Sequence, residues 1–312
     1  MTQTAADVGT ALKSAARETR RRGWSRERVE SRLIAILKWV GVIFFVAVTA
    51  FPFLYMLLLS VRPIADLARD PGALVVPLER LTFNTYGEVL RSVEDGGQGF
   101  VSFLRNSAII ATVAVIASLL LAIPGAYAIS RLEFFGRRQV SFVFLAIYLF
   151  PAILLAIPLF VFFTRLGLRG SLLGLMIVYA SQTVPVTIHM LRTYFNSIPE
   201  SLEESATLEG CNRFQVMRYI SIPLAMPAIM STGLFVFMIA WNEFLFALLF
   251  LVDRRESWTV SLGLSQLAQS TIEVPTTVVM AGAVILTVPV IVLFFLTERL
   301  LVEGLTAGAE KG

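Results

Sequence analysis

Residues 204–223 read Glu-Ser-Ala-Thr-Leu-Glu-Gly-Cys-Asn-Arg-Phe-Gln-Val-Met-Arg-Tyr-Ile-Ser-Ile-Pro, and they lie between two long apolar runs. Two helices that cross a membrane one after the other need only a short turn between them. This connection is instead longer, charged and rich in residues that favour helices. A polar segment of this kind on a membrane protein indicates contact with something outside the bilayer.

The rest of the chain is dominated by apolar residues. Of its 312 residues, 56% are hydrophobic and only 15% are charged, whereas soluble domains carry about 25% charged residues. An apolar run of about 20 residues is long enough to cross a bilayer. The sequence therefore predicts an all-α polytopic membrane protein with six transmembrane helices. The apolar runs cover about 34–60, 104–129, 140–163, 171–191, 222–251 and 277–301.

Single cysteine and histidine residues limit the chemistry that is open to this chain. Cys211 has no partner for an internal disulfide, and one cysteine cannot build a multi-cysteine metal site. His189, which is predicted to be a packed polar residue of the fourth span, leaves little for zinc chemistry or histidine-based catalysis. We therefore expect neither a metal site nor catalytic residues.

Positive charge is concentrated in the tail formed by residues 1–33 and at the start of the first span. An isoelectric point near 9.5 would also suit nucleic-acid binding, but this cluster just before an apolar run favours a cytoplasmic segment facing anionic lipid. We expect no nucleic-acid partner. The basic residues of this cluster are Lys13, Arg17, Arg20, Arg21, Arg22, Arg26, Arg28, Arg32 and Lys38.

The distribution of basic residues also predicts the orientation in the membrane. The first apolar run is too long for a signal peptide and is counted as a span. With both termini inside, the inner segments hold more Arg and Lys than the outer ones. The long connections 61–103 and 252–276 then lie outside, either as contacts for an external partner or as solvated linkers. The tail 304–312 lies inside.

The inner segment 192–221 is predicted to form two helices joined by a turn. Ser197 with Glu200 resembles a capping box that starts the first helix. Gly210 fits a helix end that needs a positive φ angle, and Asn212 begins the second helix. The resulting hairpin is short and rigid.

The surface of the first hairpin helix is acidic. Ile198, Leu202 and Ala206 form a narrow apolar stripe, and the remaining surface carries several glutamates. A helix that lies on lipid is rich in Lys and Arg, so a protein with a basic cleft fits this segment better than a membrane surface does. An ordinary linker between two spans is the alternative.

The hairpin resembles the signature loop of bacterial ABC-importer permeases, whose pattern is Glu-Ala-Ala-x3-Gly-x9-Ile-x-Leu-Pro. Two positions depart from it conservatively, Ser205 for Ala and Ile222 for Leu. The x3 and x9 gaps are intact, which makes the match specific. The matching residues are Glu204, Ala206, Gly210, Ile220 and Pro223.

Other segments resemble the second permease of carbohydrate importers of the maltose type. The similarity extends over about residues 34–312 and leaves the basic tail uncovered. It predicts the type I ABC-importer permease fold in a bacterial inner membrane, with residues 34–303 as the permease domain. The similar segments are 83–86, 105–107, 124–131, 135–137, 241–244 and 304–312.

This resemblance implies a set of partners. In such importers, two permeases form the pathway across the bilayer, two cytoplasmic ATPases drive transport, and an external solute-binding protein delivers a sugar. The present chain would be one permease, with a sister permease beside it. It would hold no cofactor, since ATP and Mg²⁺ belong to the ATPases. A non-sugar solute such as a glycerol phosphate or a polyol is the alternative cargo.

The resemblance also assigns roles to residues. The hairpin would be the coupling helix that docks in an ATPase cleft, and the outer loop 252–276 would reach the binding protein through Trp258. Asn242 and Glu243 are polar residues inside a span, and they either line the solute path, stabilise its outer gate or form a polar contact with the sister permease. The predicted ATPase-coupling residues are Leu202, Glu203, Glu204, Ser205, Ala206, Gly210, Phe214 and Pro223.

Two other classes of protein fit the sequence less well. The chain lacks the Gly-x4-Gly-Lys-Ser/Thr pattern of P-loop ATPases and the His-Glu-x-x-His pattern of zinc peptidases. A secondary transporter would have no use for an acidic hairpin on its inner side. The sequence therefore predicts a transporter subunit and not an enzyme.

Overall fold

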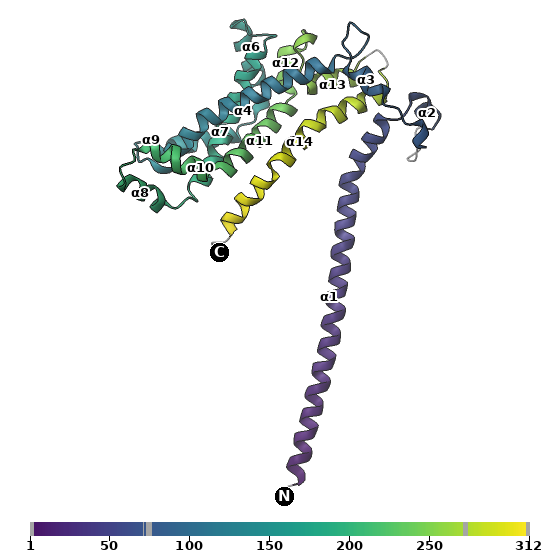
Figure 1. Cartoon of the computed structure of the whole chain (residues 1–312), viewed down its shortest axis with the longest axis vertical. Coiled ribbons are helices and arrows are strands. Elements are labelled where there is room, and N and C mark those ends of the chain that lie inside the picture. The colour runs from purple at the N-terminus through teal and green to yellow at the C-terminus, as the bar shows by residue number, and fades with distance from the viewer. Residues whose placement is uncertain (1–2, 71, 73–76, 271–273, 310–312) are drawn as a thin grey trace. The chain divides into compact units, whose positions relative to one another are not determined.

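The computed structural model describes residues 3–70, 72, 77–270 and 274–309, and the regular structure in these ranges is helical, with no strand (Figure 1). Helix η2 is a π-helix, and η1 and η3 are short 3-10 helices. In chain order the elements are α1 (Gln3–Ser60), α2 (Ile64–Arg69), η1 (Leu78–Arg80), α3 (Asn84–Leu90), α4 (Phe100–Arg131), α5 (Arg137–Leu149), α6 (Ala152–Arg165), α7 (Leu172–Phe195), α8 (Glu200–Leu208), α9 (Arg213–Val216), η2 (Met217–Ser221), α10 (Ile222–Leu224), α11 (Met226–Asn242), α12 (Leu245–Leu251), η3 (Arg255–Ser257), α13 (Val260–Ala268) and α14 (Thr276–Ala309).

The chain divides into two compact units, residues 1–58 and 59–312. The first unit is formed by α1, a single helix that runs from the basic tail into the first apolar run. The part of α1 that is long and apolar enough to cross a membrane is Glu30–Ser60. The change in composition near residue 33 therefore falls inside a continuous helix.

Several helices have the length and composition of membrane spans. Four helices qualify individually, and six spans result if each of two sharply bent helix pairs counts as one. This agrees with the six spans predicted from the apolar runs. The four single helices are Glu30–Ser60, Phe100–Arg131, Leu172–Phe195 and Thr276–Glu298.

The apolar runs 140–163 and 222–251 do not form single straight helices. The first run contains α5 and α6, which meet at 92°. Pro151 explains this break, because proline lacks an amide hydrogen and disfavours helical geometry in the preceding residue. The second run bends by 75° just before Pro227 and is interrupted again at Glu243, where α11 ends. Each of these two predicted spans is therefore built from bent helical segments.

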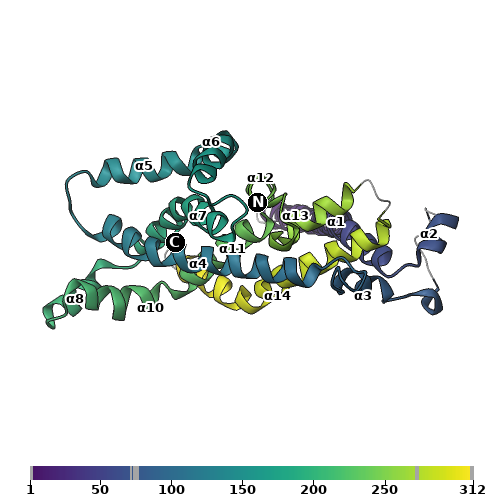
Figure 2. The same ribbon diagram turned by 90° about the horizontal axis from the view of Figure 1, so that it is seen from above.

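In the second unit, α4 lies along α7, and α11 packs against α4, α7 and α14. Figure 2 shows that α4 extends from the region of α3 and α13 at one end to the region of α8 and α10 at the other. Phe103 of α4 lies under Gly263 of α13, where an added Cβ atom would come within 2.4 Å of the ring. Close packing without a side chain thus fixes the first end of α4.

The second end of α4 belongs to a separate cluster of buried side chains. Tyr127 packs edge-on against Phe195 of α7, with ring centroids 6.0 Å apart. Ile198, which follows α7, and Ala225, which precedes α11, are also buried in this cluster. The hairpin packs against this cluster of buried side chains.

Candidate functional site

The hairpin between α7 and α11 has the turn and the second cap that the sequence predicts. Gly210 has φ 96°, in the left-handed region that favours glycine. The side chain of Asn212 accepts a hydrogen bond from the Gln215 amide at 2.9 Å, and the Gln215 side chain accepts one from the Asn212 amide at 2.8 Å. These reciprocal bonds form a complete capping box.

The predicted cap at Ser197 is wrong. Helix α8 starts at Glu200, with Pro199 at the N-cap position and no side-chain cap. The Ser197 hydroxyl instead donates to the Tyr194 carbonyl at 2.7 Å, and the Ile198 amide donates to the Phe195 carbonyl at 3.2 Å. Both residues therefore close the end of α7, so that α8 begins later than the capping pattern suggested.

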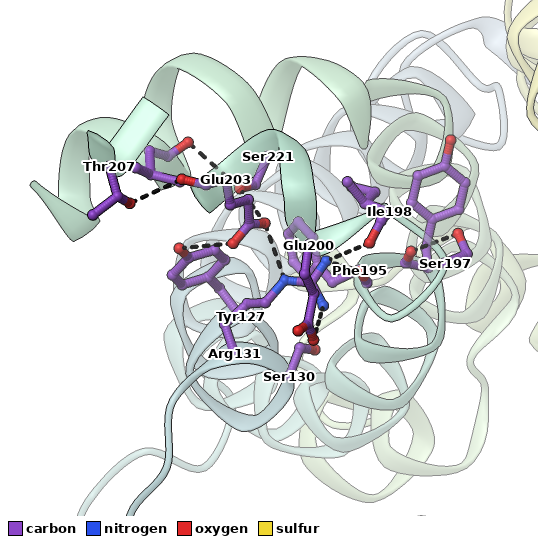
Figure 3. Close-up of polar contacts among 12 residues, drawn as sticks. Tyr127, Ser130, Arg131, Phe195, Ser197, Ile198, Glu200, Glu203, Thr207 and Ser221 are labelled. Carbon is purple, nitrogen blue, oxygen red and sulfur yellow. Dashed lines mark hydrogen bonds and ion pairs between the residues drawn. The ribbon is translucent and has the colours of Figure 1, made fainter. Parts of the chain in front are cut away.

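Glu203 is the most buried acidic side chain of the hairpin, with 3% of the residue exposed. Its carboxylate accepts hydrogen bonds from Arg131 Nε at 3.0 Å, Ser221 Oγ at 2.9 Å and Tyr127 Oη at 3.4 Å (Figure 3). Three elements, α4, α8 and η2, thus meet at one carboxylate. Glu203 is one of the predicted ATPase-coupling residues, but its side chain faces the permease itself.

Arg131, the last residue of α4, completes this cluster. One of its terminal nitrogens, Nη2, donates to the carbonyls of Phe195 at 2.6 Å and Ile198 at 2.8 Å. The other lies 3.7 Å from Glu200, and only 5% of the Arg131 side chain is exposed. A cation at the C-terminal end of a helix is favourable, because the last carbonyls there lack helical partners. The guanidinium therefore joins α4 to the end of α7 as well as to α8.

In the sequence, Arg131 contributes to the positive charge of the inner side and to the family-like segment 124–131, and neither pattern assigns it a contact. The available signal was an arginine at the end of an apolar run, on the same side of the membrane as an acidic hairpin. The sequence did not indicate which of the glutamates it meets.

The opposite face of the hairpin is exposed. Leu208 is 90% exposed, Phe214 68% and Leu202 46%, and Glu204 also lies on the surface. Large apolar side chains this open to solvent are typical of a surface that binds a partner. Of the remaining predicted residues, Ser205, Gly210 and Pro223 are exposed, whereas Ala206 is buried.

A pocket of about 440 Å³ lies where α8 meets the end of α4. It combines carboxylates and guanidinium groups with one exposed apolar side chain, and it is continuous with the exposed face. Its lining residues are Arg131, Glu200, Glu203, Glu204, Thr207, Leu208 and Arg213.

Glu243 stabilises a helix break within its own chain. Its carboxylate accepts a hydrogen bond from the Tyr179 hydroxyl and bonds from the amides of Phe246 at 2.9 Å and Ala247 at 3.2 Å. These amides begin α12 and have no partner inside that helix. Asn242 is exposed, and its side chain donates to the Met238 carbonyl at 2.9 Å. A role for Asn242 and Glu243 in the solute path stays a prediction.

Trp258 is partly buried in its own loop. Its indole nitrogen donates to the Val252 carbonyl at 3.2 Å, and its ring lies 5.7 Å from the Phe103 ring. The Arg255 guanidinium lies over the Trp258 ring, 5.5 Å from its centroid. The predicted contact between Trp258 and a binding protein is not tested by these contacts and stays a prediction.

Two neighbouring residues of α4 hold the same loop. Asn106 Nδ2 donates to the carbonyls of Glu256 at 2.9 Å and Trp258 at 3.1 Å. Ser107 Oγ accepts a hydrogen bond from the Val260 amide at 2.8 Å. Both side chains are almost fully buried. In the sequence, Asn106 and Ser107 are marked only by the family-like segment 105–107. Their contacts with this loop arise from helix packing, which the sequence does not indicate.

The remaining residues considered for metal chemistry show no such arrangement. Within the ranges that the structure describes, no group of three or more His, Cys, Asp or Glu residues is placed to hold a metal ion. Cys211 is a free, partly exposed thiol in the hairpin. His189 is exposed and stacks on Tyr148 with the ring centroids 6.4 Å apart, so it is less enclosed than the sequence suggested.

Several helices are long enough to cross a membrane, which defines a polytopic membrane protein. The hairpin between two of them has one buried and one exposed face, as expected of a segment that contacts a partner outside the bilayer. Comparison with known proteins then identifies the group. The profile of the family described as "Binding-protein-dependent transport system inner membrane component" matches residues 114–305, and the chain belongs to this family. It is thus the permease subunit of an ABC importer, a transporter component and not an enzyme.

Relatives in several organisms match nearly the whole chain. It is 36% identical over 287 residues to the trehalose/maltose transport system permease protein MalG of Thermococcus litoralis, covering 92% of this chain and 99% of the relative. Identity to the inner membrane ABC transporter permease protein YcjP of Escherichia coli is 35% over 274 residues, with coverages of 88% and 95%. Identity to the trehalose transport system permease protein SugB of Mycobacterium tuberculosis is 34% over 262 residues, with coverages of 84% and 92%.

Solved structures show the same fold. A chain of a bacterial ABC transporter involved in import of the acidic polysaccharide alginate matches with a TM-score of 0.74 at 27% identity, covering 86% of this chain and 96% of that one. A chain of the MetNI methionine ABC transporter, at 16% identity, shares the fold with a TM-score of 0.50, covering 72% of this chain and 99% of that one. The predicted ABC-importer permease fold is confirmed.

Proposed function

We propose that this chain is one of two different permease subunits of a carbohydrate importer. Two ATPase subunits on the inner side, which hold ATP and Mg²⁺, drive transport, and an external solute-binding protein delivers the sugar. The names of two relatives, for trehalose and maltose, support a carbohydrate cargo. The chain itself holds no cofactor. Both its termini lie in the cytoplasm, as the basic residues around the first span favour.

The division of the hairpin into two faces carries this proposal. Glu203 and Ala206 face the permease, whereas Glu204, Leu208 and Phe214 face outward. A simple linker has no need for exposed apolar side chains next to an acidic one. Burying Leu208 and Phe214 in a partner would contribute about 1.5–3 kcal/mol each. An exposed ion pair from Glu204 adds about 1 kcal/mol or less and mainly sets the orientation.

The geometry of the hairpin fits transmission of motion. The Gly210 turn and the capping box at Asn212 fix the two short helices relative to each other. Closure of the ATPases on ATP would move the hairpin as one body, together with the spans that flank it. Outward- and inward-facing states then alternate because ATP binding favours one of them.

A charge reversal at the exposed face tests docking. Glu204→Lys should reduce the amount of ATPase that co-purifies with the permease, because it places like charges in a basic cleft. Glu133→Lys is the matched control, since Glu133 is also exposed and lies in the loop between α4 and α5. Equal ATPase recovery from both variants would contradict the docking role of the hairpin.

The cargo needs a separate experiment. The whole transporter, with its binding protein, is reconstituted in vesicles, and ATP-dependent uptake of radiolabelled trehalose and maltose is measured. Glycerol 3-phosphate and a polyol such as sorbitol serve as competitors. Uptake of a sugar that neither competitor reduces supports the carbohydrate assignment. Transport of the competitors alone would replace it.

A further inference from the structure

Helix α4 is attached to a different functional segment at each end. It is continuous for 32 residues, which corresponds to about 48 Å at 1.5 Å per residue. One end meets the hairpin, and the other meets the loop between α12 and α13 (Figures 1 and 2). Neither segment is joined to α4 directly along the chain. These attachments therefore exist only through side-chain contacts.

The attachment at the hairpin end is a buried ion pair. Arg131 and Glu203 bond at 3.0 Å, and their side chains are 5% and 4% exposed. Ser221 Oγ reaches the same carboxylate oxygen from the π-helix η2 (Figure 3). Removing one member of such a pair leaves an uncompensated buried charge, so the two parts separate only at a large cost.

The attachment at the other end is a set of neutral hydrogen bonds to backbone groups. Asn106 and Ser107 bind the chain at Glu256, Trp258 and Val260. Because the bonds go to the backbone, they fix the path of the loop independently of its side chains. A tilted contact between the Phe103 and Trp258 rings, whose centroids lie 5.7 Å apart, adds an apolar interaction at the same place.

We propose that α4 is a connecting rod between the two sides of the transporter, with Arg131, Glu203, Asn106 and Ser107 as its positioning residues. Movement of the hairpin shifts α4 through the Arg131–Glu203 pair, and α4 shifts the loop that Asn106 and Ser107 hold. The inference rests on the proposed function, in which the ATPases act on the hairpin and the binding protein acts on the outer surface. By linkage, occupancy at either end favours the same state at the other.

The proposed connection through α4 differs from the covalent connection of the hairpin to its neighbouring helices. The hairpin continues directly into α7 and α11, and these helices would move with it even without the ion pair. If they alone transmit the movement, loss of the Arg131–Glu203 bond affects stability but not communication between the two sides. The two routes therefore predict different results for variants of the positioning residues.

The experiment uses the complete transporter in vesicles and measures ATP hydrolysis with and without the sugar-loaded binding protein. Glu203→Gln keeps the size of the side chain and an acceptor oxygen, and it removes the charge that faces Arg131. We expect the ATPases to co-purify normally, while stimulation by the binding protein falls at least about fivefold, the lower range of allosteric coupling. Arg138→Gln is the control, since Arg138 is exposed and lies in the first turn of α5.

The outer attachment provides an independent test. Asn106 lies about 38 Å along the helix from Arg131, at 1.5 Å per residue. Asn106→Ala and Ser107→Ala should reduce stimulation to a similar extent, and Ser107→Thr, which keeps the hydroxyl acceptor, should retain it. If Glu203→Gln fails to assemble, the reduction in these outer variants still supports the rod, and full stimulation in them overturns it.

A double variant with one substitution at each end of α4 distinguishes a single connection from two unrelated effects. Distant, independent substitutions have additive free energies, so their fold-losses multiply. If α4 transmits the movement as a single connection, the double variant Asn106→Ala with Glu203→Gln loses no more stimulation than the more strongly impaired of the two single variants. Multiplied losses would overturn the inference. Absence of stimulation in the unaltered transporter would instead contradict the proposed function.

Discussion

Glu203 and Glu204 are adjacent in α8, but the first is buried and the second is exposed. Glu203 is 3% exposed and is bonded to Arg131, whereas Glu204 lies on the outer surface of the hairpin. A helix turns about 100° per residue, so neighbours separate readily between a buried and an open face. One acid therefore anchors the hairpin, and the other is exposed, as the proposed docking on an ATPase requires.

This difference predicts unequal effects on stability. Glu203→Ala leaves the Arg131 charge buried and unpaired, which should lower the free energy of unfolding by about 3–5 kcal/mol. Glu204→Ala, at an exposed position, should change it by about 0.5 kcal/mol or less. Thermal unfolding of the purified permease in detergent measures both. Similar shifts in midpoint for the two variants would show that Glu203 is not buried as described.

Gly210 is predicted to be essential for coupling. A β-branched residue at φ 96° is strained by about 1–3 kcal/mol, so Gly210→Val should displace the second hairpin helix. Membrane insertion should be normal, with ATP hydrolysis uncoupled from uptake. Gly41→Val is the control, because Gly41 lies in α1 with no atom within 4 Å of an added Cβ. Normal uptake by Gly210→Val would rule out the turn as a rigid element.

The capping box at the second hairpin helix should act as one unit. Asn212→Ala removes a cap worth about 1 kcal/mol, and Gln215→Ala removes the return bond. Because the bonds are reciprocal, the double variant should lose less than the sum of the single losses. Protease cleavage within the hairpin is the measurement. Strictly additive increases in the cleavage rate would indicate two unrelated bonds.

We expect the main role of Glu243 to be stabilisation of the fold. Glu243→Ala leaves the first amides of α12 and the Tyr179 hydroxyl without their acceptor, which should cost about 1–3 kcal/mol for each buried group. Tyr179→Phe should also lower stability, and the double variant should be less than additive. If Glu243→Ala instead changes the apparent affinity for the transported sugar at unchanged stability, the carboxylate belongs to the solute path.

Cys211 provides a direct test of the proposed orientation. It is the only cysteine of the chain and lies partly exposed in the hairpin. A membrane-impermeant maleimide should label it in permeabilised cells and not in intact ones. In a Cys211→Ser background, the exposed Glu94→Cys should be labelled in intact cells. The reverse pattern would place the hairpin outside and the 61–103 segment inside.

Much of the hairpin was predictable because its signals are local. The turn at Gly210 and the cap at Asn212 depend on residues within a few positions of each other, and both predictions are confirmed. The predicted cap at Ser197 is wrong because Ser197 and Ile198 bond to the end of α7 instead. The breaks at Pro151 and Glu243 were missed because an apolar run gives length but not direction.

The sequence by itself determined that this protein crosses a membrane several times, and that a polar hairpin with the importer signature interrupts the apolar runs. Long apolar segments have this outcome because a backbone in lipid must satisfy its hydrogen bonds internally. Only the tertiary structure decided which polar residues anchor the fold. Arg131 and Glu203 are 72 positions apart, and Asn106 and Trp258 are 152 apart. Such pairs form only where helix packing brings two distant segments together, and no local pattern records that packing.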